Sequence, residues 1–270
     1  MTGAVDVDPT TGTLRTPEET LSAIARHRTR DAVISLTLAA AIIGGWLAAH
    51  IYGVFFIDLA TTPWWISAGL AGLLTWLYVG MFIVAHDAMH YSLVPRMRWA
   101  NRAIGQVALG LYAGFSFKQL ITKHRDHHIH AGTDRDPDFH AAGNLSFLAW
   151  YVKFFSEYFA WQQAAMIAAA VAAYVMVLDV SLANIWAFWA GPALISSLQL
   201  FTFGTYLPHR EEEAAPFADH HRARTNNWDW WVSLLTCFHF GYHHEHHLYP
   251  NVPWWRLPAA HAEMIDGHAS

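Results

Sequence analysis

Two long stretches of this 270-residue chain contain no lysine or arginine. They are residues 31–95 and 154–209, and all 16 basic residues lie in 15–30, 96–153 or 210–256. Both stretches are largely apolar, and about 20 apolar residues are enough to cross the core of a bilayer. A buried soluble bundle would not separate its charges in this way. The pattern therefore predicts an integral membrane protein.

Each basic-free stretch divides at a short break. The four apolar segments predict four transmembrane helices in two hairpins, 32–57 with 64–85 and 166–180 with 184–207. Pro192 should kink the last helix. The two breaks carry Asp58 and Asp179 and no cation. Since cytoplasmic loops are enriched in lysine and arginine, we expect both hairpins to open toward the cytoplasm.

The remaining segments are more polar. Residues 145–161 and 227–240 are rich in aromatic residues and predict interfacial helices, while 101–120 either crosses part of the membrane or lies along its surface. The fold class we expect is all-α, with four transmembrane helices, interfacial helices and a histidine-rich cap on the cytoplasmic side. The domain division we expect is a polar N-terminal tail, one membrane domain and a C-terminal tail, at residues 1–30, 31–258 and 259–270.

Composition excludes several classes of protein. Charged residues make up 14% of the chain, against roughly 25% in soluble domains. The single cysteine, Cys237, leaves no internal disulfide, no cysteine-based zinc site and no cysteine-ligated iron–sulfur cluster. The net charge of -5 provides no basic surface for nucleic acid.

Nineteen histidines are present, and eight of them form three boxes. The first box is H-x-x-x-H and the other two are H-x-x-H-H, and together they comprise His86, His90, His124, His127, His128, His243, His246 and His247. Residues three and four apart share one helical face, so the histidines of each box can point at one spot. Imidazole is a ligand for iron, zinc, copper and nickel. The recurrence of the spacing predicts metal binding.

The number of ligands indicates two metals. His209, just after the fourth apolar segment, is a plausible ninth ligand, whereas a zinc site normally stops at four. Di-iron bundles of the ferritin kind use Glu and Glu-x-x-His, which the apolar segments lack, so an all-imidazole pair is predicted. Metal-bound histidines usually donate their other N–H to a carboxylate or carbonyl. The outer-partner candidates are Asp87, Asp126 and Glu245, with Asp136, Asp138, His239 and His244 also close to the boxes.

The chemistry that fits is oxidation of an unactivated C–H bond. Imidazole suits redox-active iron, open positions would admit O2, and a substrate arriving from lipid would be long and apolar. Electrons must come from outside, because the chain has no haem-attachment pattern and no Gly-rich dinucleotide turn after a strand. We expect His50, inside the first apolar segment, to be a packed or interfacial histidine rather than a ligand.

The three boxes, HDAMH, HRDHH and HHEHH, resemble those of the membrane fatty-acid-desaturase-like superfamily of di-iron oxygenases. The runs GTDRDPDF, FGTYLPHRE and HFGYHHEHHLYP are more narrowly similar to the bacterial β-carotene ketolase family. This resemblance implies a bacterial inner-membrane enzyme with two non-haem irons and a ferredoxin-type electron donor. It implies conversion of the C4 methylene of a β-ionone ring to a ketone by two hydroxylations and loss of water, with the metal role carried by the box histidines and by His209.

One position departs from the family pattern. Tyr91 follows the first box where a small residue such as glycine is expected. If Tyr91 faces the substrate tunnel, the preference between plain and hydroxylated β-rings differs from the family norm. Two alternatives remain. One is a fatty-acyl or sphingolipid desaturase or hydroxylase, which would share the boxes. The other is a membrane metal transporter, which would place its ligands near the bilayer midplane.

Overall fold

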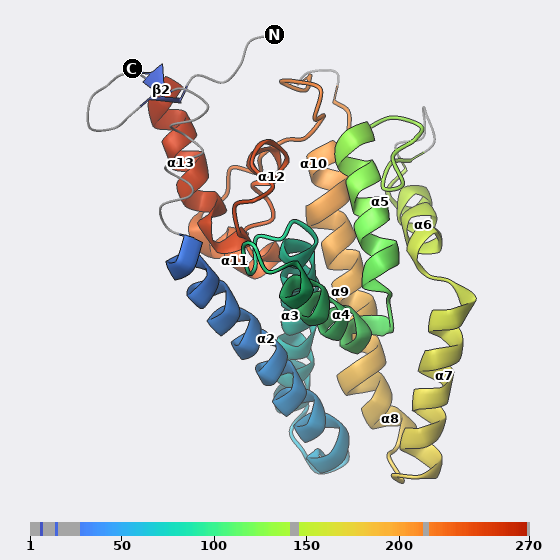
Figure 1. Ribbon diagram of the computed structural model, residues 1–270. Coiled ribbons are helices and arrows are strands. Elements are labelled where there is room, and N and C mark those ends of the chain that lie inside the picture. The colour runs from blue at the N-terminus through green and yellow to red at the C-terminus, as the bar shows by residue number, and fades with distance from the viewer. Residues whose placement is uncertain (1–5, 8–13, 16–27, 141–145, 213–215, 269–270) are drawn as a thin grey trace.

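The computed structural model describes residues 6–7, 14–15, 28–140, 146–212 and 216–268. Almost all of the regular structure is helical (Figure 1). The longer helices are α2 (Arg28–Phe56), α3 (Trp64–Met89), α4 (Arg98–Ala113), α5 (Phe117–His130), α6 (Phe147–Tyr158), α7 (Trp161–Met176), α9 (Gly191–Leu200) and α13 (Leu257–His268). Shorter elements are α8 (Leu182–Ile185), η1 (Trp186–Ala190), η2 (Phe201–Tyr206), α10 (Leu207–His209), α11 (Trp230–Cys237), α12 (His243–Leu248) and η3 (Trp254–Arg256). The antiparallel strands β1 (Asp6–Val7) and β2 (Leu14–Arg15) pair near the N-terminus.

In the part of the chain that the structure describes, three helices are long and apolar enough to cross a membrane. They are Thr29–Phe56, Trp64–Met89 and the continuous run Leu182–His209, which match three of the four predicted segments. The other predicted segment corresponds to α7, which is joined to α6 across a bend of 80°. The bent pair counts as a fourth span only if α6 and α7 cross together. The turns between α2 and α3 and between α7 and α8 lie at the same end of the molecule (Figure 1).

Helix α3 is the centre of the bundle. It packs against α2, α4 and α9, and nearly every residue of its second half is buried, from Leu74 to Met89. In α2, by contrast, large apolar side chains such as Ile51 and Phe56 are exposed. Lipid can cover such side chains as well as protein can, so α2 forms part of the outer apolar surface. The histidines of the first box therefore emerge from the most enclosed helix of the protein.

The run Leu182–His209 contains two π-helical segments, and a proline follows each one. Pro192 comes after η1 and Pro208 comes after η2. Proline has no N–H, and its ring collides with the carbonyl four residues earlier. Widening the helix to i→i+5 bonding relieves that collision and shifts each carbonyl in the widened turn to an N–H one residue further along. The predicted kink at Pro192 thus takes the form of a local widening of one continuous helix.

His50 is a packed histidine, as the sequence predicted. Its Nδ1 lies 3.3 Å from the carbonyl oxygen of Phe188. Phe188 is four positions before Pro192, and proline has no N–H to donate to that carbonyl. Its Nε2 lies 3.0 Å from the Tyr174 hydroxyl, and its ring stacks on Trp46. His50 thereby links α2 to α7 and η1.

The cap of the molecule is built from α11 to α13 and the segments that join them (Figure 1). The backbone N–H of Trp254 donates to Asp87 at 3.1 Å, and Arg256 donates to Asp31 at 2.6 Å. These bonds tie the segment before α13 to the ends of α3 and α2. The C-terminal segment expected as a tail is the helix α13, and most of the expected N-terminal tail lies outside the described residues.

The aromatic segments expected at the membrane surface are helical. Residues 147–158 form α6 and 230–237 form α11, and α11 exposes Trp230, Trp231 and Leu235. The segment 101–120, for which the sequence left two possibilities open, is divided between α4 and α5 with a break at Gly114, which has φ = 70°. Helix α5 then carries the second histidine box out of the bundle.

Candidate metal centre

Among the described residues, nine histidines gather at the last turn of α3 and past it, in two adjoining groups. The five-histidine cluster consists of His86, His90, His124, His128 and His246. In this group each histidine offers one ring nitrogen, and these atoms all lie within 4.8 Å of one another. The His90 and His124 Nε2 atoms are 2.6 Å apart, and His128 Nε2 is 3.1 Å from His246 Nε2. Helices α3, α5 and α12 thus bring their histidines to one point.

The four-histidine cluster consists of His127, His209, His243 and His247, and all four are buried. His247 Nε2 lies 3.2 Å from His127 Nε2 and 3.1 Å from His243 Nε2. His209 enters from the end of the run Leu182–His209, and its ring centroid is 4.7 Å from that of His243. The ninth ligand proposed from the sequence therefore lies inside a cluster.

Each H-x-x-H-H box is divided between the two clusters. In α5, His124 and His128 enter the five-histidine cluster while His127 enters the other. In α12 the division is reversed, because His243 and His247 enter the four-histidine cluster and His246 enters the five-histidine one. Residues four apart lie almost on one helical face, and the residue three along is rotated away from the first. The expectation that the histidines of a box point at one spot is therefore met by the first box, whose His86 and His90 share the five-histidine cluster, and is wrong for the two H-x-x-H-H boxes, which divide two-plus-one.

The donor sets fit two metal ions. Within the described residues, several buried ring nitrogens have no hydrogen-bond partner, including both nitrogens of His86 and Nε2 of His209. A buried polar group left without a partner costs about 1–3 kcal/mol, and native proteins contain few of them. Two bound cations, one in each cluster, would give the converging ring nitrogens the partners that they lack.

Burial keeps most of these imidazoles neutral, as ligation requires. It lowers the pKa of His128 to about 2, with added repulsion from His127. Burial first, and then neighbouring imidazoles, hold the pKa values of His124, His243 and His246 well below the usual range. Their lone pairs are therefore available at neutral pH.

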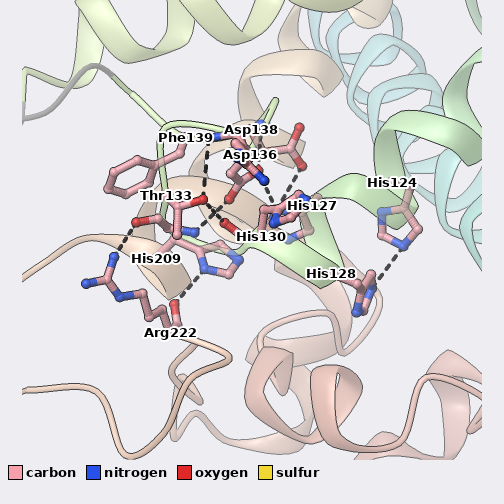
Figure 2. A network of polar contacts seen from close by, with 12 residues as sticks. His124, His127, His128, His130, Thr133, Asp136, Asp138, Phe139, His209 and Arg222 are labelled. Carbon is pink, nitrogen blue, oxygen red and sulfur yellow. Dashed lines mark hydrogen bonds and ion pairs between the residues drawn. The ribbon is translucent and has the colours of Figure 1, made fainter.

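His127 differs because carboxylates lie behind it (Figure 2). Its Nδ1 is 2.9 Å from Asp136 Oδ1 and 3.7 Å from Asp138 Oδ2. Burial alone would lower the pKa of His127, but the charges of Asp138 and Asp136 outweigh it and raise that pKa. The Nδ1 proton faces Asp136, which leaves Nε2 as the atom available to a metal. An outer carboxylate of this kind fixes the tautomer and makes the imidazole a stronger donor.

Asp136 is itself held by the loop after α5. It accepts hydrogen bonds from the backbone N–H groups of Gly132 at 2.8 Å and Asp138 at 2.9 Å. Gly132 has φ = 67°, a left-handed conformation that glycine adopts without strain. The DPDF run thus forms the support of His127, and in the same way His209 Nδ1 donates to the carbonyl of Arg222 at 2.7 Å.

The three acids first proposed as outer partners take different positions. Asp87 is buried, but its carboxylate is 3.8 Å from His86 Nδ1, too far for a hydrogen bond. Asp126 is exposed on α5, and the structure does not bring it to the clusters. Glu245 is buried and accepts from Thr225 at 2.5 Å and His261 at 2.6 Å. Glu245 therefore secures α12 to α13.

Two further histidines near the boxes, His244 and His239, make hydrogen bonds within the cap. His244 Nε2 lies 3.0 Å from Asp219, and His239 Nδ1 lies 3.2 Å from the Ser233 hydroxyl, so both hold the cap together. The partners that the sequence did not indicate are a backbone carbonyl (Arg222), a hydroxyl (Thr225) and His261. No spacing or motif marks them, because each is brought to the site by a separate loop or helix.

A largely apolar chamber of about 300 Å³ adjoins the clusters. Histidines of both clusters form part of its wall, namely His86, His124, His127 and His243. The rest is mostly aromatic or aliphatic, with Phe82, Tyr112, Phe154, Trp189 and Leu200 among the lining residues. Along the run Leu182–His209 the lining extends from Trp189 to Thr205, which is roughly 24 Å of helix. The chamber therefore suits a long apolar molecule with one end at the histidines.

Tyr91 is not among the residues that line this chamber. It has φ = 58° and lies in the turn after α3, with the Arg98 guanidinium 5.6 Å from its ring centroid. The premise that Tyr91 faces the tunnel is therefore not met. The backbone explains why a glycine is expected there, since glycine adopts this left-handed conformation without strain.

The amino-acid sequence is similar to those of known proteins. The fatty acid desaturase family model matches residues 62–164 and 141–267. Two proteins from Paracoccus strains, both named beta-carotene ketolase, are 48% and 50% identical to this chain. The alignments cover 88% and 85% of this chain, and 97% and 93% of those proteins. This chain belongs to the β-carotene ketolase family. Within the same family, a zeaxanthin 4-ketolase of Chlamydomonas reinhardtii is 36% identical over 83% of this chain and 52% of its own length.

Proposed function

We propose that this chain is an O2-dependent β-carotene 4-ketolase with two non-haem irons. The reaction converts the C4 methylene of a β-ionone ring to a ketone. Two successive hydroxylations give a geminal diol, which loses water, and each hydroxylation consumes one O2, two electrons and two protons. The observation that carries the proposal is a chamber, long and apolar, that has histidines of both clusters in its wall.

The nine clustered histidines would hold the metals, five on one ion and four on the other. Bound iron would supply the activation of O2 that oxidation of an unactivated C–H bond requires. Asp136 holds the Nδ1 proton of His127, and the Arg222 carbonyl accepts the Nδ1 proton of His209. These two bonds keep the imidazoles in one tautomer and one orientation.

The chamber walls position the substrate. Aromatic side chains such as Phe82, Tyr112 and Phe154 enclose an apolar guest and exclude water from it. Since both clusters contribute to one end of the chamber, a ring that enters lengthwise presents its terminal carbons to the histidines. The aliphatic polyene would then lie along the part of the chamber that continues toward Trp189. This geometry favours oxidation at the end of a long molecule over oxidation in its middle.

The membrane arrangement that we propose has four spans, with α7 as the third, and both hairpins open to the cytoplasm of a bacterial inner membrane. In support, both proposed far-side turns lie at one end of the molecule, opposite the cap (Figure 1). The basic residues lie on the cap side of the hairpins, as expected for a cytoplasmic face. The carotenoid would enter from the lipid, and a reduced ferredoxin-type protein would deliver electrons from the cytoplasm.

Two other functions fit less well. An acyl-lipid desaturase or hydroxylase of the same superfamily would share the histidine boxes, but the relatives at 48% and 50% identity are named ketolases. A metal transporter would place its ligands near the bilayer midplane, whereas the two clusters lie at the last turn of α3 and past it, at the end of a candidate span. Neither alternative accounts for the family membership and the chamber together.

The test is pigment analysis of a β-carotene-producing bacterium that expresses the chain. We expect echinenone and canthaxanthin, the mono- and diketone products, and about two iron ions per purified chain because the histidines form two donor sets. Unchanged β-carotene in cells that contain folded, iron-loaded protein would overturn the ketolase proposal. Feeding acyl lipids to the same host would then test the rival function.

A further inference from the structure

The hydroxyl of Thr205 behaves differently from those of most other threonines in the described helices. In five of them, Oγ1 donates to the carbonyl four residues earlier, and these are Thr37, Thr75, Thr122, Thr202 and Thr236. The Thr205 hydroxyl makes no hydrogen bond with any residue of the described part of the chain, although the side chain is buried. It is also not among the fully inaccessible side-chain N and O atoms that lack a partner, so the hydroxyl oxygen keeps some accessible surface.

The helix geometry explains this freedom. Thr205 lies in η2, the π-helical segment that precedes Pro208. In a π-helix the backbone bonds run from i to i+5, so the carbonyl of Phe201 is out of register for the usual bond from Thr205. Thr202, at the start of the same segment, keeps its bond to Leu198 at 2.7 Å. The widened turn therefore frees one hydroxyl.

That hydroxyl belongs to a residue of the chamber wall. Other O–H groups there are already committed. Ser196 donates to the Ala193 carbonyl at 2.8 Å, so Tyr112 must donate in its 2.9 Å bond with Ser196. The Tyr158 hydroxyl donates to Asp138. Within the described residues that line the chamber, Thr205 is left as the hydroxyl with a free donor.

The hydroxyl of Ser197, which also lines the chamber, is committed as well. Its hydroxyl donates to the Leu194 carbonyl at 2.8 Å and accepts from Tyr151 at 2.7 Å. Trp189 also lines the chamber and carries an N–H, but it lies twenty residues before His209 on one continuous helix, roughly 30 Å away. Thr205 lies four residues before His209, roughly 6 Å along the axis. The free hydroxyl is thus at the histidine end of the chamber.

Neighbouring contacts agree with this placement. A Cβ added at Gly204 would be 3.2 Å from the ring of Phe240. The Phe240 ring centroid is 4.5 Å from that of His86 and 4.8 Å from that of His243. Gly204 therefore lets η2 approach an aromatic ring that touches both clusters, and Thr205 follows directly.

We propose that Thr205 is a specificity-determining residue that hydrogen-bonds a hydroxyl on C3 of the ring. C3 is bonded to C4, so a group that reads a C3 hydroxyl must lie beside the carbon undergoing oxidation. The ligand class is the 3-hydroxylated β-ring, as in zeaxanthin, in addition to the plain ring of β-carotene. This inference rests on the proposed ketolase function. An unpaired hydroxyl in an otherwise apolar chamber gains a partner from the hydroxylated ring and gains none from the plain one.

The experiment compares three variants with the wild type in membranes supplied with a reducing system. Thr205→Val keeps the shape and removes the hydroxyl, Thr205→Ser keeps the hydroxyl and removes the methyl, and Thr202→Val is the matched control on the same segment. Equal amounts of β-carotene and zeaxanthin compete, and the ratio of their 4-keto products is measured. Iron content and protein level are measured in each preparation.

We expect Thr205→Val to lower the zeaxanthin-to-β-carotene ratio about tenfold, the effect of one hydrogen bond in an apolar site. Thr205→Ser should restore most of the ratio, and Thr202→Val should leave it at the wild-type value. An unchanged ratio in Thr205→Val, or a wild type that ketolates β-carotene and never zeaxanthin, would overturn the inference and leave the ketolase proposal intact. A wild type that ketolates neither pigment, while folded and iron-loaded, would overturn the proposed function itself.

Discussion

The two histidine clusters use the same side chain in two different ways. The four-histidine cluster is wholly buried, and two of its members are held from behind by Asp136 and by the Arg222 carbonyl. The five-histidine cluster has one more imidazole, but His90, His124 and His128 are only half-buried. The four-histidine cluster is therefore held by enclosure and outer hydrogen bonds, whereas the five-histidine cluster depends on the number of its histidines. We expect the loss of a single ligand to be tolerated less in the four-histidine cluster.

The largest effect should follow from removing a ligand of the four-histidine cluster. His243→Ala leaves three imidazoles around that position, whereas His90→Ala leaves four in the other cluster. Outer partners alone are worth about 10–100-fold in metal affinity or activity, so loss of a ligand should cost about 100-fold or more. We expect His243→Ala to reduce ketone formation by that factor and iron to about one per chain, with His90→Ala less severe.

Arg125→Ala is the control for this pair, because Arg125 is exposed on α5 next to His124. It should retain iron and most of the activity. Membrane insertion should persist in all three variants, since none of the three positions lies in a candidate span. Full activity with two irons in His243→Ala would remove that residue from the ligand set.

The next effect concerns the support behind His127. Asp136→Asn removes the charge that holds the Nδ1 proton and places an amide against the N–H groups of Gly132 and Asp138. We expect a loss of roughly 10–100-fold in iron affinity at the four-histidine cluster, measured by equilibrium competition with a chelator. Asp126→Asn is the matched control, because Asp126 is an exposed acid on α5 next to His127 in sequence and belongs to neither cluster. Equal losses in the two variants would mean that net charge, and not the bond to His127, sets the affinity.

A smaller effect should distinguish the clusters in the unmodified protein. Because three histidines of the five-histidine cluster reach the surface, a water-soluble chelator should approach that metal first. We expect iron release in two phases, with the faster phase about tenfold quicker, as a barrier difference of about 1.4 kcal/mol would give. His90→Ala should accelerate the fast phase alone. A single phase for both ions would show that the difference in enclosure does not govern release.

The gathering of the histidines could be predicted from the sequence, because local spacing within a helix decides which side chains share a face. All eight box histidines and His209 were predicted, and the structure brings all nine together. The two-plus-one division of each H-x-x-H-H box was not predicted, since it depends on where α5 and α12 face one another. The outer partners illustrate the same limit. Asp136 lies nine residues from His127 and was only one of several nearby acids, whereas the Arg222 carbonyl carries no side-chain signal at all.

The helices were predicted with similar unevenness. Hydropathy identified α2, α3 and the run Leu182–His209, because apolar length is a property of the sequence alone. It could not separate α3, which is central, from α2, which is peripheral, since lipid and protein cover apolar side chains alike. Nor could it place the π-helical segments, although Pro192 and Pro208 mark where each one ends. The free hydroxyl of Thr205 is a consequence of that local geometry.

The smallest effect concerns the turn that carries His90 of the five-histidine cluster. Tyr91 adopts φ = 58°, and a left-handed non-glycine residue costs roughly 1–2 kcal/mol. Tyr91→Gly removes that strain and also the contact with Arg98, whereas Tyr91→Ala removes the contact and keeps the strain. The glycine variant should therefore be more stable than the alanine variant by about 1 kcal/mol, seen as a higher thermal midpoint of the iron-loaded protein in detergent. Both should keep the wild-type ratio of zeaxanthin to β-carotene products, because Tyr91 lies outside the chamber. A changed ratio in both variants would mean that the turn after α3 shapes the substrate site, and would weaken the assignment of ring preference to η2.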